Sequence, residues 1–96
     1  MKTLRHLGTS REDSAKEAAV IRSMIEDLGR TIQILQIDIC SEEERARVFD
    51  KADPLYSVLA RTLMCRRDNL IATVSDLEER LHSVTRVFRA PISEAA

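Results

Sequence analysis

Glycine and proline are scarce in this sequence of 96 residues, which contains two of each. Both interrupt regular secondary structure, glycine through its backbone freedom and proline through its fixed φ and missing N–H. Long segments therefore run uninterrupted between Gly8, Gly29, Pro54 and Pro91. This scarcity argues against a chain of many short elements and predicts a few long ones.

Long apolar runs are absent as well. No stretch approaches the roughly 20 apolar residues that a membrane-spanning helix needs. The first residues, MKTLRHLG, lack the apolar middle of a signal peptide. We therefore expect a cytoplasmic protein with no membrane partner.

The chain also lacks an excess of charge of either sign. Fifteen basic residues balance sixteen acidic ones, which leaves a net charge of −1. Bulk charge therefore favours no polyanionic partner. The basic residues Arg61, Arg66 and Arg67 have no aromatic residues interleaved with them, and the chain has only three aromatics. Nucleic-acid binding is accordingly the weakest of the functions that we consider.

Residues that usually carry chemistry are few. Cys40 and Cys65 lack the spacing of a metal site, and the helical pattern described below places them on different outward sides, so we predict two free thiols. His6 and His82 have no serine or cysteine at the spacing of a catalytic triad, and we expect both in solvent. The sequence therefore assigns no catalytic residue, cofactor or metal ligand, and we expect no enzymatic activity.

The stretch TIQILQIDIC, residues 31–40, resembles a β-strand because its apolar residues nearly alternate. That alternation changes parity at Ile34 and Leu35, and no second strand-like segment exists for it to pair with. A heptad pattern, with steps of three and four residues, passes through the stretch without a break and predicts a helix. Its residues are Ala18, Ile21, Ile25, Leu28, Ile32, Leu35 and Ile39, with Ala46 and Phe49 in the same phase.

Local signals set the expected boundaries. Thr9 or Ser10, followed by acidic residues, is typical of a capping box at a helix start. Asp53 before Pro54 predicts a second start, because Asp caps helices and Pro fits the first helical position. Pro91 should lie beyond the second helix. The expected organisation is an N-terminal arm (1–9), a hairpin (10–90) made of a helix (about 10–50), a turn (about 50–53) and a helix (about 54–89), and a frayed tail (91–96).

The second helix repeats the heptad pattern. Its predicted seam consists of Tyr56, Ala60, Leu63, Arg67, Leu70, Val74, Leu77, Leu81, Val84 and Phe88. When the chain folds back at the turn, the residue numbers of facing positions keep a constant sum along both seams. The sequence therefore predicts an all-α fold, a long antiparallel, coiled-coil-like hairpin in register over its whole length.

Apolar residues outside the seams suggest a partner. Ile34 and Ile37 fall on the back of the first helix, and Met64 and Ile71 widen one flank of the second. A chain of this size buries a marginal core by itself. We therefore expect these four residues to form an oligomer interface that joins two hairpins into a four-helix bundle, most simply a homodimer. The alternative is that they are ordinary exposed residues.

Charged residues on or beside the seams form the last candidate site. Glu42 and Arg67 occupy seam positions, and Asp38 and Arg66 flank them, which predicts a polar core cluster of ion pairs that fixes the register. The alternative is a small helical-bundle enzyme or ligand-binding protein that uses this cluster. The function expected from the sequence is a self-associating protein–protein interaction or adaptor module.

Overall fold

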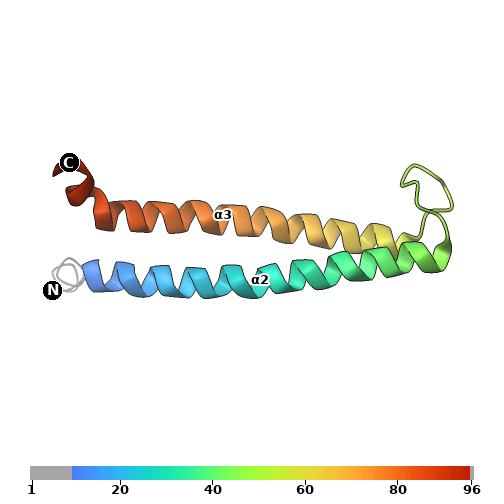
Figure 1. The fold of residues 1–96 in the computed structure, drawn as a ribbon, viewed down its shortest axis with the longest axis horizontal. Helices are drawn as coiled ribbons and strands as arrows, with labels where there is room; N and C mark the ends of the chain where they lie inside the picture. The colour runs from blue at the N-terminus through green and yellow to red at the C-terminus, as the bar shows by residue number, and fades with distance from the viewer. Residues whose placement is uncertain (1–9, 96) are drawn as a thin grey trace, which may run out of the picture. The chain divides into compact units, whose positions relative to one another are not determined.

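The computed structural model describes residues 10–95, and the side chains of 11–86. Two helices make up the described part of the fold: α2 spans Ser10–Ala46 and α3 spans Val58–Ala95. They pack against each other as an antiparallel hairpin (Figure 1), and no strand occurs between residues 10 and 95. The predicted all-α hairpin is confirmed. Neither α2 nor α3, within these residues, is long and apolar enough to cross a membrane.

The hairpin consists of two compact units. Unit 1 contains α2 up to Glu26 and α3 from Asp76 onward, and unit 2 contains residues 27–75, including the connection between the helices. In each unit, a segment of α2 packs along a segment of α3 that runs in the opposite direction. Each unit is therefore an antiparallel helix pair in its own right.

The predicted seams supply the core of both units. Unit 1 buries Ala18 and Ile21, and unit 2 buries Leu35, Ile39 and Ala60 together with Tyr56. The other apolar seam residues with described side chains are half-buried inside the helices: Ile25, Leu28, Ile32, Ala46, Leu63, Leu70, Val74, Leu77, Leu81 and Val84. The side chain of Phe88 lies outside the described residues. The heptad spacing correctly identifies the contact face of each helix, although much of that face is incompletely covered.

Helix α2 runs unbroken from Ser10 to Ala46, through Gly29 and Ser41. A Cβ atom added to Gly29 would meet nothing within 4 Å, so no close helix contact requires a glycine there. Glu12 and Asp13 in the first turn and Arg45 in the last turn complement the helix dipole. Helix α2 begins at Ser10, as expected from the acidic residues of its first turn.

Helix α2 ends earlier than predicted, at Ala46 instead of about residue 50. Arg47 adopts a left-handed conformation with φ of 62°, and its N–H donates to the Glu43 carbonyl at 2.8 Å. This is the αL termination that glycine normally provides, so the residue type gives no warning of it. Phe49 consequently leaves the predicted seam and is exposed.

Two successive turns build the connection. The Asp50 carboxylate accepts from the Ala52 N–H, and the Asp50 carbonyl accepts from the Asp53 N–H. Asp53 repeats the pattern with Leu55 at 2.8 Å and Tyr56 at 3.0 Å. Each Asp thus stabilises a β-turn through its side chain and its carbonyl, which is a common role for this residue.

The start of α3 at Val58 corrects the prediction that Asp53 and Pro54 begin this helix. Pro54 occupies the second position of the Asp53–Tyr56 turn, where its fixed φ fits equally well. Ser57 is the actual cap, because its hydroxyl oxygen accepts from the Ala60 N–H at 3.1 Å and its carbonyl accepts from the Arg61 N–H. An Asp-Pro pair is typical both of a helix start and of a β-turn, so these two residues alone do not distinguish the two structures.

The C-terminal boundary also differs from the prediction. Helix α3 continues to Ala95 and therefore includes Pro91, which we expected beyond its end. The ribbon of α3 bends toward its red end, the part that contains this proline (Figure 1). A proline inside a helix removes one backbone hydrogen bond and crowds the preceding turn, which commonly produces a bend. The predicted arm of residues 1–9, with Thr9 and His6, lies outside the described residues.

The two possible helix starts predict opposite effects of Ser57→Ala. Loss of the cap should destabilise the protein by about 1 kcal/mol, which corresponds to a melting temperature lower by about 4–8 °C. Were α3 to begin at Pro54 instead, position 57 would be a helix interior, where Ala is the better helix former. An unchanged or higher melting temperature by circular dichroism would therefore contradict the observed start.

Candidate interaction surface

The four residues of the predicted polar core cluster do not form one group of ion pairs. Glu42 is buried, and its ion pair is with Arg45, one turn further along α2. Arg67 donates to the Gln36 side-chain oxygen at 2.8 Å and pairs with Asp68 at 3.0 Å. Glu42 and Arg67 therefore do not form the ion pair that we expected between them.

The physical reason is that each charge has another partner, one that keeps access to water. Burial of a carboxylate is costly unless it is paired. Arg45 is itself exposed and reaches Glu42 along the surface of the same helix. Arg67 extends its guanidinium from the seam to the rim of the helix pair, where Gln36 and Asp68 are exposed. The spacing of these residues in the sequence does not determine the direction of their long side chains.

The other two members of the predicted cluster are exposed. Neither Asp38 nor Arg66 makes an ion pair or a side-chain hydrogen bond with the part of the chain that the structure describes. Both belong to unit 2. The structure therefore moves Asp38 and Arg66 from a core cluster to the surface.

Tyr56 anchors the connection onto α2, a role that the sequence analysis did not foresee. Its side chain is buried, and its hydroxyl donates to Glu43 Oε2 at 2.6 Å, with Met64 Sδ 3.5 Å away. The Arg61 guanidinium lies 5.3 Å from the centre of its ring, within the range of a cation–π contact. The sequence signal for this role was a single tyrosine close to the predicted turn and to an acidic run.

The environment of Tyr56 raises its pKa above the ordinary value of 10.0. The hydrogen bond to Glu43 is the largest cause, and burial and the negative charge of Glu43 act in the same direction. Arg61 and Arg67 partly oppose this effect. Because the folded-state pKa is raised, the stabilisation by neutral Tyr56 is fully present below pH 10 and is lost as the pH rises through the folded-state pKa.

These contacts define two sides of the helix pair in unit 2. The Tyr56 hydroxyl meets Glu43 of α2 and Met64 of α3, so these residues mark one side, which we call the tyrosine side. Gln36 lies two helical turns before Glu43 and shares that side. A residue two positions along a helix is rotated by roughly 200°. Asp38 and Arg66, two positions after Gln36 and Met64, therefore lie on the opposite side, which we call the charged side.

The predicted interface residues are largely exposed but do not form a single patch. Ile34 and Ile37 of α2 are 57% and 64% exposed, and Ile71 of α3 is 47% exposed. Met64 is half-buried against Tyr56. Ile71 lies two turns after Met64 and shares the tyrosine side, whereas Ile34 lies one turn before Asp38 on the charged side, and Ile37 borders it on the back of α2. One flat surface cannot include both groups.

A second apolar group was missed by the sequence analysis. Leu55 and Val58 are each 77% exposed, and Phe49 and Leu59 are about half exposed. We call these four residues the connection patch, because they surround the connection between α2 and α3. The connection patch exists because α2 ends earlier and α3 begins later than predicted, which leaves Phe49 and Leu55 outside the helices.

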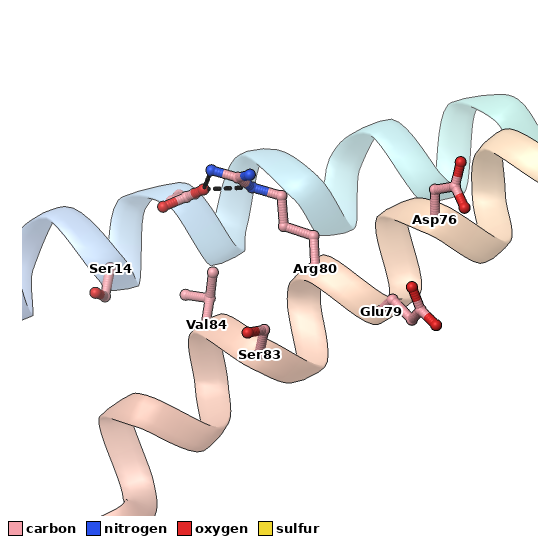
Figure 2. Close-up of a pocket in the computed structure, with 7 residues that line it drawn as sticks. Ser14, Asp76, Glu79, Arg80, Ser83 and Val84 are labelled. Carbon is pink, nitrogen blue, oxygen red and sulfur yellow. Dashed lines mark hydrogen bonds and ion pairs between the residues drawn. The ribbon is translucent and has the colours of Figure 1, made fainter.

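Unit 1 has a polar hollow on its surface (Figure 2). Arg80 reaches from α3 to Glu17 of α2 and donates at 2.7 Å, while Glu79 points away from Arg80. The remaining lining residues are Ser14, Asp76, Ser83 and Val84. Arg80, the one cation among the described lining residues, is thus already paired with Glu17. In residues 11–86, no three histidine, cysteine or acidic side chains are arranged to hold a metal ion.

Cys40 and Cys65 are free and exposed, as predicted.

The chain matches no protein-family model, no curated protein and no solved structure.

The environment of Tyr56 can be measured directly, because it is the only tyrosine of the chain. Alkaline titration followed by ultraviolet absorbance should give a midpoint above 10.0 in the folded protein. Glu43→Gln should lower that midpoint, since it removes the carboxylate that favours the neutral phenol. Glu44→Gln, an equal charge change at an exposed neighbour, should leave it near the wild-type value. An equal response of both variants would contradict the Tyr56–Glu43 hydrogen bond.

Proposed function

We propose that this protein is a self-associating protein–protein interaction module, in which two hairpins pack into a four-helix bundle. Each chain contributes α2 and α3, and the proposed contact covers part of unit 2 that is exposed in one chain. The proposal rests on one observation, the exposure of Ile34 and Ile37 on the back of a helix whose seam already faces α3.

The energetic argument concerns these isoleucines first. Burial of a large aliphatic side chain contributes about 1.5–3 kcal/mol relative to exposure. In a symmetric dimer each side chain is buried twice, once per copy. Ile34 and Ile37 therefore offer a large part of the stability of a small domain, which is about 5–15 kcal/mol in total.

The incomplete core of the single chain supports the same conclusion. Most apolar seam residues are half-buried, and the polar residues Glu42 and Ser57 are among the few buried ones. Two helices offer each other one contact stripe, whereas each helix of a four-helix bundle has two neighbours. A second copy would therefore cover surfaces that one hairpin leaves open.

A ligand-binding function around Glu42 and Arg67 has less support. Arg45 already pairs with Glu42, and Gln36 and Asp68 already occupy Arg67. An anion or metal would have to displace these partners. No single contact in unit 2 favours such a site over the apolar surface.

The double variant Ile34→Glu/Ile37→Glu tests the proposal. Both positions are exposed in one chain, so glutamates there should be tolerated by an independent hairpin. At an interface they would remove apolar burial and bring like charges together. We expect the variant to have the mass of one chain by light scattering and to lose most of its helicity and thermal stability. Ile37→Ala should show a milder loss that higher protein concentration reverses.

Ala19→Glu/Ser23→Glu is the matched control. It adds two negative charges at exposed positions of the same helix, away from the two isoleucines. This control should keep the mass and melting temperature of the unmodified protein. If the isoleucine variant behaves like the control, Ile34 and Ile37 are ordinary surface residues and the proposed bundle is wrong.

A further inference from the structure

Given the proposed self-association, we infer that Asp38 and Arg66 of each copy form reciprocal ion pairs with Arg66 and Asp38 of the other copy. These pairs would select the arrangement in which α2 of one hairpin faces α3 of its partner. The inference rests on the proposed function and specifies which side of unit 2 forms the interface.

The first support is the position of the two charges. Both lie on the charged side of unit 2, away from the side marked by Tyr56, and both are exposed without an ion pair in the described chain. The hydrogen bond between Gln36 and Arg67 shows that this part of α2 and this part of α3 lie at the same level. One acidic and one basic group thus occupy neighbouring helices at one level.

The second support is that apolar residues continue the same side. Ile34 lies one turn before Asp38 on α2, and Leu59 lies two turns before Arg66 on α3. Both are more than half exposed, and Leu59 belongs to the connection patch. The charged side therefore combines apolar area with a pair of opposite charges, the usual composition of a contact surface.

Symmetry then decides between the possible arrangements. A two-fold axis parallel to the helices places α2 opposite α3 of the partner, so that Asp38 faces Arg66 across the interface twice. A two-fold axis that crosses the helices at this level places α2 opposite α2, and the same charges then face like charges, which is unfavourable. The charges therefore favour the first arrangement. It also puts both connection patches at the same end, where they can cover each other.

Single charge reversals test the pairing. Asp38→Arg leaves two basic residues at positions 38 and 66. Arg66→Asp leaves two acidic residues at the same positions. Each variant alone should dimerise at least about tenfold more weakly than the unmodified protein at low salt, because like charges face each other. Sedimentation equilibrium gives the dissociation constants. Glu26→Arg makes the same charge change at an exposed α2 position and should have little effect.

Mixing the two variants separates contacts between chains from contacts within one chain. An equimolar mixture should form a heterodimer at least tenfold tighter than either homodimer, because opposite charges then face each other only across chains. The double variant Asp38→Arg/Arg66→Asp should also recover affinity. Circular dichroism of the mixture and of the double variant shows that both chains still fold.

Three results would overturn the inference. Single variants that dimerise like the unmodified protein would leave the self-association intact and refute the Asp38–Arg66 pairing. Weakened variants that the mixture does not rescue would refute it as well. An unmodified protein that stays monomeric at every concentration would refute the proposed function together with the inference.

Discussion

Two helices can bury only one stripe of side chains against each other, and this limit governs the whole molecule. The heptad pattern supplies that stripe on both helices, and the best-covered residues, such as Ala18, Ile39 and Ala60, all belong to it. Every other apolar residue must remain partly in water or find a second surface. The exposure of Ile34, Ile37 and Ile71 follows directly from the geometry of a pair. The proposed partner is the second surface that this geometry lacks.

The same limit explains the treatment of polar groups. A narrow pair of helices has no deep interior, so a long charged side chain can reach water from almost any position. Arg67 leaves the seam for Gln36 and Asp68, and Glu42 takes its partner from its own helix. Tyr56 is the exception, because its ring is buried and its hydroxyl donates to the Glu43 carboxylate.

The sequence predicted the regular part of this fold and failed at its ends, for identifiable reasons. Hydrophobic periodicity accumulates evidence over many turns, so the helical character of residues 31–40 was unambiguous despite their strand-like composition. Helix ends depend on single residues with more than one role. Arg47 takes a conformation that its side chain does not favour, and Pro54 serves a turn where a helix start was expected.

The candidate interaction surface was likewise predicted only in part from the sequence. Spacing alone identified Ile34, Ile37 and Ile71 as apolar residues outside the seam, because position on a helix fixes direction at Cβ. It could not predict that Asp38 and Arg66 would be exposed and unpaired within the described chain, because rotamers decide where long side chains end. The connection patch could not be predicted either, because it depends on the end of α2 at Ala46 and the start of α3 at Val58.

The dependence of mass and helicity on concentration tests the central claim most directly. Sedimentation equilibrium and circular dichroism of the unmodified protein should be measured over the same dilution series. The account predicts twice the chain mass of 10.9 kDa at high concentration, and a loss of helicity that accompanies dissociation on dilution. A mass of 10.9 kDa with full helicity at every concentration would contradict it, because the hairpin would then be stable without a partner.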